Sequence, residues 1–115
     1  VARDFPVKAV EWIQQNQPSG RIFDAYGWGG YLIWTIYPEY QVFIDGRADV
    51  YGADFLKNYM DILSIKPGWQ QAFSQYGIST VLIEPESVMA NFLRQSADWR
   101  VSYEDETGVI FSQNP

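Results

Sequence analysis

Aromatic side chains gather around a glycine-rich turn in the first third of the sequence. Tyr26, Trp28 and Tyr31 alternate with glycines, and Trp34 and Tyr37 follow. Flat rings with a polar group bury large apolar areas against a sugar, and α/β folds bind ligands between a strand and the next helix. The pattern predicts a sugar-stacking platform, and the alternative is that the rings belong to the core. The glycine spacing matches neither a dinucleotide fingerprint nor a P-loop.

A second polar group, in the segment FIDGRAD, contains Asp45, Arg47 and Asp49. Arginine binds anionic groups through paired hydrogen bonds, or it pairs with carboxylates of its own loop. Asp54 adds a further carboxylate, but the spacing is not that of an EF-hand, and we predict neither a metal site nor a cofactor. The predicted ligand-binding residues are Tyr26, Trp28, Tyr31, Asp45, Arg47 and Asp49. The alternative is an Asp–Arg pair that only orders the loop.

Three carboxylates, Asp24, Asp45 and Glu84, lie at or just after the ends of predicted strands. If these strands are parallel, their carboxyl ends share one edge of the sheet, and an acidic cleft results. Because the chain contains neither His nor Cys, this group is the only one in the sequence from which an enzyme could be built. That composition excludes Ser-His-Asp triads, thiol nucleophiles and cysteine-ligated metals. We assign no catalytic residue.

Length and charge narrow the class of protein further. The chain has 115 residues, of which 47% are hydrophobic, and a net charge of −6. This is the composition of one globular domain, residues 1–115. The acidic balance argues against nucleic-acid binding, which needs a basic stripe. The longest strongly apolar stretch, residues 31–37, is too short to span a bilayer.

Turn signals divide the chain into alternating helices and strands. Apolar spacing predicts helices at 7–16, 31–37, 54–63, 69–76 and 85–93, and strands at 21–25, 41–45, 78–83, 99–103 and 109–111. For residues 31–37, a strand remains the alternative. The order predicts a small single-domain α/β fold with a mainly parallel sheet of about five strands, an antiparallel C-terminal hairpin, and helices that cover the sheet.

The run YGWGGYLIWTIYPEYQVFIDGRADVYG, from Tyr26 to Gly52, resembles the C-terminal soluble region of bacterial polytopic membrane proteins of the glycosyltransferase C type. Its most specific pieces are Trp28–Leu32 and Phe43–Arg47. In that family, lipid-linked sugar donors are used at the extracytoplasmic face, and the catalytic carboxylates usually lie on loops between membrane helices. A more distant similarity is to the soluble domain of the oligosaccharyltransferase catalytic subunit. The Asp of its WWDYG motif is missing here, so peptide recognition is not carried over.

The resemblance implies a soluble domain cut from a longer membrane protein, on the periplasmic side of a bacterial inner membrane. We expect it to be non-catalytic alone and to assist glycan or lipid-linked acceptor binding. Its expected partners are the transmembrane part of its own parent chain and a glycan or lipid-linked sugar, with no nucleic acid. Two alternatives stay open. One is a purely structural or interaction module, and the other is an autonomous carbohydrate-active enzyme that uses carboxylates.

Overall fold

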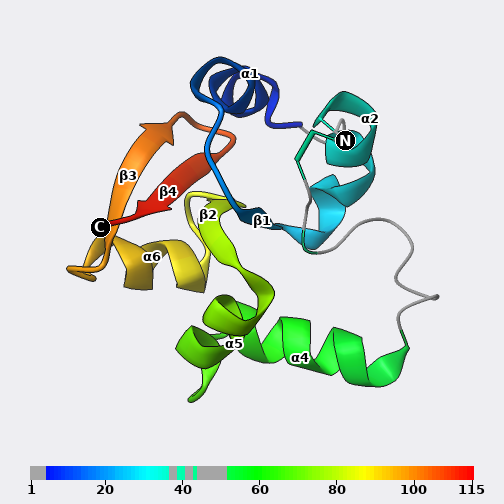
Figure 1. Cartoon of the computed structure of the whole chain (residues 1–115), viewed down its shortest axis with the longest axis vertical. Coiled ribbons are helices and arrows are strands. Elements are labelled where there is room, and N and C mark those ends of the chain that lie inside the picture. Colours follow the sequence, from blue (N-terminus) through cyan, green and yellow to red (C-terminus); the bar gives the residue numbers. More distant parts are fainter. Residues whose placement is uncertain (1–4, 37–38, 41–42, 44–51) are drawn as a thin grey trace.

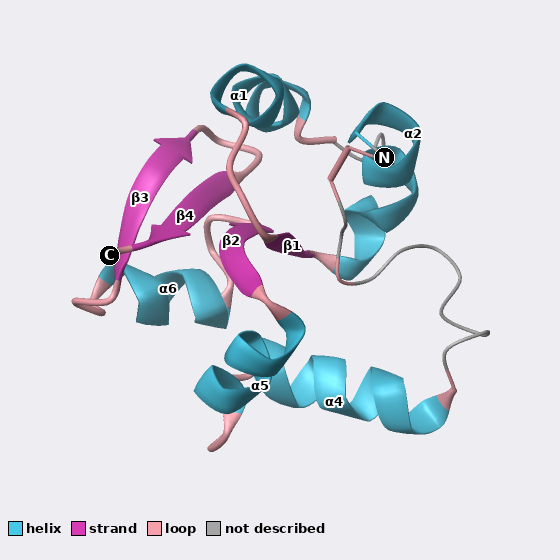
Figure 2. Ribbon diagram, viewed as in Figure 1, coloured by secondary structure: helices cyan, strands magenta, loops and turns pink. Residues whose placement is uncertain are grey.

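The computed structural model describes residues 5–36, 39–40, 43 and 52–115. A mixed sheet of four strands, in the order β1-β2-β4-β3, lies at the centre of this described part (Figures 1 and 2). The strands are β1 (Arg21–Asp24), β2 (Ile78–Ile83), β3 (Trp99–Glu104) and β4 (Val109–Gln113). β1 and β2 pair in parallel, whereas β4 pairs antiparallel with both β2 and β3.

The prediction of a mainly parallel sheet of about five strands is therefore wrong. Within the described residues, one strand pair is parallel and two are antiparallel. The closing hairpin causes the difference, because its second strand, β4, inserts beside β2 and places β3 at the edge. The strand predicted at 41–45 lies outside the described residues except for Phe43, whose amide donates a hydrogen bond to the carbonyl of Ile22 at 2.8 Å.

The helices begin and end close to the positions that the apolar spacing predicts. They are α1 (Val7–Asn16), the 3-10 turn η1 (Tyr26–Trp28), α2 (Gly29–Ile36), α4 (Ala53–Leu63), α5 (Trp69–Tyr76) and α6 (Val88–Arg94). Gly77 ends α5 in a left-handed conformation with φ 71°, as expected of a glycine cap. The Ser87 hydroxyl begins α6 by accepting a hydrogen bond from the Ala90 amide at 3.2 Å.

Alternate strand residues point to opposite faces of the sheet, and each face has its own core. Phe23, Val81 and Phe111 belong to a core shared with α4, α5 and α6. Their neighbours Ile22, Leu82 and Ile110 belong to a second core shared with α1 and α2. Figure 1 shows the two helix groups on either side of the strands. The result is three layers, with the sheet enclosed between helices.

Helix α6 is less buried than its sequence suggests. Met89 and Leu93 are buried, whereas the apolar side chains of Val88 and Phe92 are exposed. The helix is tied to β3 by Arg94, whose two terminal nitrogens donate to the two carboxylate oxygens of Glu104 at 2.8 and 2.6 Å. This two-point ion pair lowers the pKa of the Glu104 carboxyl.

Strand β3 forms one edge of the sheet, and its pairing with β4 is irregular. The register shifts between Val101 and Tyr103, at the position of Ser102. The Ser102 and Ser112 hydroxyls lie 2.6 Å apart and share a hydrogen bond across the pair. Such a shift bends an edge strand and interrupts its row of backbone groups.

Gly20, just before β1, is a position where glycine is required. Its φ is +83°, and a Cβ built there would collide with the Ser79 hydroxyl. Gly68 has φ +97° with open space around it. We expect Gly68→Ala to lower the free energy of unfolding by about 1–2 kcal/mol, from φ alone.

We expect Gly20→Ala to lower the free energy of unfolding clearly more than Gly68→Ala does. The double variant Gly20→Ala/Ser79→Ala should recover part of this difference. Urea unfolding of the three variants measures both effects. Equal losses for the two glycine variants would show that the collision with Ser79 is relieved without cost.

Candidate functional site

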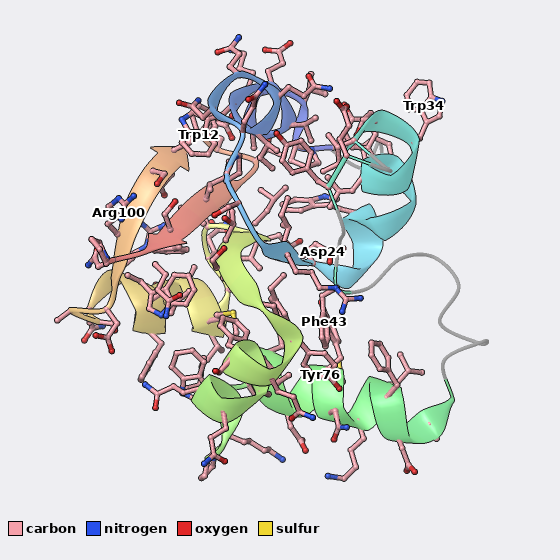
Figure 3. The ribbon with its side chains drawn as sticks, in the orientation of Figure 1. Trp12, Asp24, Trp34, Phe43, Tyr76 and Arg100 are labelled. Atoms are coloured by element: carbon pink, nitrogen blue, oxygen red, sulfur yellow. The ribbon has the colours of Figure 1, made fainter. Side chains whose placement is uncertain are left out.

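Helix α2 turns an apolar face inward and an aromatic face outward. Leu32 and Ile36, four residues apart, are buried in the second core beside Trp28. Trp34 lies on the opposite face and is 81% exposed. In Figure 3 its ring projects away from the body of the molecule. An exposed indole of this size is unusual, since tryptophan is normally mostly buried.

Trp34 is one of three neighbouring aromatic rings. Phe5 and Tyr31 are stacked, with centroids 4.8 Å apart and ring planes 7° from parallel. Tyr31 also contacts Trp34, with a centroid distance of 6.3 Å and a tilt of 59°. We call Phe5, Tyr31 and Trp34 the α2 aromatic surface. Because Tyr31 is held by Phe5 and by its place on the helix, the surface is preorganised for a flat apolar ligand.

A cavity of about 450 Å³ adjoins the α2 aromatic surface, and Phe5 lines both. One wall is the start of α1, with Val7 and Lys8, and the other is the β3–β4 turn, residues 105–107. The cavity therefore combines an aromatic edge, one ammonium group and the carboxylates of Asp105 and Glu106. Such a mixture of apolar and convergent polar groups is typical of ligand sites.

The carboxylate of Asp105 builds the turn that forms this wall. One oxygen accepts from the amides of Thr107 at 2.8 Å and Gly108 at 2.9 Å, and the other accepts from the Tyr103 hydroxyl at 2.7 Å. Burial acts to raise the pKa of Asp105, but these hydrogen bonds outweigh it and the pKa is lowered. The same hydrogen bond, helped by burial, raises the pKa of Tyr103 to about 12.

The structure describes only some of the six predicted ligand-binding residues, and it places these in different surroundings. Tyr31 belongs to the α2 aromatic surface, whereas Trp28 is 3% exposed and packs in the second core. Tyr26 begins η1, and its side chain lies outside the described part of the structure. Three of the predicted residues lie outside the described residues altogether, namely Asp45, Arg47 and Asp49.

The acidic cleft expected at one sheet edge is present only in part. β1 and β2 are parallel, Asp24 pairs with Leu82, and Glu84 follows two residues later, so both acids lie at the same edge. Asp24 is fully buried, and one of its carboxylate oxygens accepts a hydrogen bond from the Phe43 amide at 3.0 Å. Glu84 is exposed. Asp45 lies outside the described residues. In this conformation a substrate does not reach the Asp24 carboxylate.

Two further features are absent from the described residues, namely a cluster of metal-ligating side chains and a helix that could span a membrane. No group of three or more Asp, Glu, His or Cys side chains among them could hold a metal ion. No helix in the part described is long and apolar enough to cross a membrane. Comparisons of the chain with protein-family models, curated proteins and solved structures found no match.

Sequence reasoning did not identify Phe5 as the stacking partner of Tyr31, and it left open whether Trp34 faces the core or the surface. The aromatic spacing does not separate a sugar-stacking platform from core rings, whereas the purely apolar Leu32 and Ile36 are buried and mark the inward face of the helix. Tyrosine and tryptophan carry polar atoms and tolerate the surface, whereas leucine and isoleucine do not. The spacing of the aliphatic residues alone would have given the correct face.

The stack between Phe5 and Tyr31 should be measurable as an interaction energy. We expect a double-mutant cycle of Phe5→Ala and Tyr31→Ala to give a coupling of about 0.5–1.5 kcal/mol, as for other aromatic pairs. A control cycle of Phe5→Ala with Met60→Ala, on α4, should give a coupling near zero. Additive losses for Phe5 and Tyr31 would contradict the stack.

The hydrogen bond between Tyr103 and Asp105 predicts a pH dependence. The pKa of Tyr103 is about 12 in the folded chain, against 10.0 for an ordinary tyrosine. The bond therefore stabilises the fold fully below pH 10, and the stabilisation is lost as the pH rises toward 12.

We expect Asp105→Asn to return the pKa of Tyr103 toward its ordinary value, because asparagine keeps the turn but loses the charge. NMR titration of the labelled tyrosine ring carbon measures this. An unchanged Tyr103 titration in Asp105→Asn would contradict the assigned cause.

Proposed function

We propose that this chain is an extracytoplasmic domain of a membrane-embedded, glycosyltransferase-like protein, non-catalytic by itself, which binds the sugar part of a glycan or lipid-linked acceptor. The observation that carries the proposal is the α2 aromatic surface, in which Trp34 is 81% exposed next to a stacked pair. Phe5, Tyr31 and Trp34 contact one another and form a contiguous apolar patch on the surface, and such patches mark interaction sites or ligand-binding grooves. Aromatic faces bind the apolar face of a sugar ring without needing a charge.

The surroundings of the surface favour a neutral sugar over the phosphate part of a lipid-linked substrate. The adjoining cavity contains the carboxylates of Asp105 and Glu106 against one ammonium group, that of Lys8. The chain as a whole carries a net charge of −6. Phosphate groups would be repelled by this field, whereas hydroxyl groups can donate to carboxylates and accept from Lys8.

A catalytic role for this chain alone has less support. The sequence contains no His or Cys, so acid–base chemistry would need its carboxylates, lysines or tyrosines. Of the three carboxylates considered, Asp24 is fully buried and holds the Phe43 amide. A structural or interaction module remains the second candidate, because Trp34 could equally pack against the membrane part of the parent chain.

NMR titration with neutral sugars tests the proposal. The chain has five tryptophans, and their indole N–H signals report on each ring separately. We expect the signal of Trp34 to move saturably with at least one neutral mono- or disaccharide, and Trp34→Ala to abolish binding at this surface. Because the side chain is exposed, Trp34→Ala should change the free energy of unfolding by no more than about 0.5 kcal/mol.

Met60→Ala is the matched control, since Met60 is also an exposed apolar residue but lies on α4. It should leave sugar binding unchanged. If every neutral sugar leaves the Trp34 signal in place, and Trp34→Ala instead weakens association with the membrane part of the parent protein, the interaction module replaces the glycan proposal.

A further inference from the structure

A second cavity lies at the other end of the strands, where β2 and β3 begin and β4 ends. Its volume is about 380 Å³, within the usual range of ligand sites. Helix α5 forms one wall, and the starts of β2 and β3 and the end of β4 form the rest. In Figure 1 this region lies on the opposite side of β1 and β2 from α2. The cavity is therefore separate from the α2 aromatic surface.

Two tryptophans form rigid walls of this cavity. Trp69 and Trp99 are each 7% exposed, and both meet the ring of Phe73 edge-on. The centroid distances are 5.3 Å for Trp69 and 5.7 Å for Trp99. The three rings thus fix one another, and the cavity does not have to be ordered when a ligand binds.

Each of these indoles carries a hydrogen-bond donor that the fold leaves available. Among the described residues, neither indole N–H has a hydrogen-bond acceptor. Both nitrogens nevertheless keep some exposure to solvent. A buried tryptophan usually places its N–H on a partner. Both tryptophans line the cavity, so a ligand bound there can offer an oxygen atom to these donors.

The rim adds side chains that both donate and accept. Gln70 on α5 and Gln113 at the end of β4 each offer an amide, and Asp98 offers a carboxylate. In the part of the chain described, these three side chains make no hydrogen bond to the protein. The backbone of Asp98 is nevertheless fixed, because its amide donates to the Ser96 hydroxyl at 3.2 Å and its carbonyl accepts from Asn114 at 2.8 Å.

The charge of the lining limits the ligand. Asp98 is the sole ionised side chain among the described lining residues, and no Lys or Arg joins it. An anionic ligand would meet a carboxylate without a compensating cation. A strongly apolar ligand would leave the amides and indole N–H groups without partners, which costs binding energy. A neutral ligand with several hydroxyl groups satisfies donors and acceptors together.

We propose that this second cavity binds one neutral sugar unit, with its hydroxyl groups on the indole N–H groups, on the amides of Gln70 and Gln113, and on the carboxylate of Asp98. The inference rests on the proposed glycan function for the class of ligand, but it uses different residues. The chain would then hold sugars at both ends of its sheet.

The test is a titration of the ¹⁵N-labelled protein with glucose, galactose, mannose, N-acetylglucosamine and glucuronic acid. We expect the indole signals of Trp69 and Trp99 to move together and saturably with at least one neutral sugar, and not with glucuronic acid. Gln70→Ala should weaken that binding roughly tenfold. Gln71→Ala is the matched control, because Gln71 is the next exposed residue of α5 and does not line this cavity.

Asp98→Asn provides an independent readout, since removal of the charge should allow glucuronic acid to bind. Shifts at Trp69 and Trp99 that persist in Trp34→Ala separate this site from the α2 aromatic surface. The proposal is overturned if none of the neutral sugars moves these two signals. It is also overturned if glucuronic acid moves them as strongly as the neutral sugars do, or if Gln70→Ala and Gln71→Ala bind equally well.

Discussion

The buried carboxylate of Asp24 is the point at which three parts of the chain meet. Its side chain accepts a hydrogen bond from the Phe43 amide at 3.0 Å, and its carbonyl accepts one from the Tyr59 hydroxyl at 2.9 Å. Burying a polar group costs free energy unless the group is hydrogen-bonded, so these two bonds stabilise the buried position of Asp24. The end of β1, the chain after α2 and helix α4 are therefore held together at one fixed position, labelled in Figure 3.

Aromatic rings pack around Phe43, the residue whose amide donates to the Asp24 carboxylate. Phe43 lies 5.2 Å from Phe23 and 5.2 Å from Phe55, and Tyr76 meets it edge-on at 4.9 Å. These contacts come from β1, α4 and α5, so the first core grows outward from the same place. The core therefore combines one polar contact that sets position with several ring contacts that supply buried area.

Local signals in the sequence predicted the elements well, and non-local pairing limited the prediction of the sheet. The apolar spacing of α5 acts within a few residues, and the bounds of this helix were predicted correctly. The insertion of β4 between β2 and β3 depends on contacts between distant segments, which no local pattern encodes. The same limit applied to the site. The sequence placed Tyr31 among the candidate ligand-binding residues, but it could not show that Trp28 turns inward or that Phe5 stacks on Tyr31.

The irregular edge at β3 has a consequence for how this domain meets other molecules. An outer strand with an even row of free backbone groups invites another strand to add to it, and this is a common route to aggregation. Here the register shift at Ser102 interrupts the row of backbone groups, and the exposed charge of Arg100 further disfavours the addition of a strand. Growth of the sheet into a neighbouring copy is disfavoured at this end. Recognition there has to proceed through side chains.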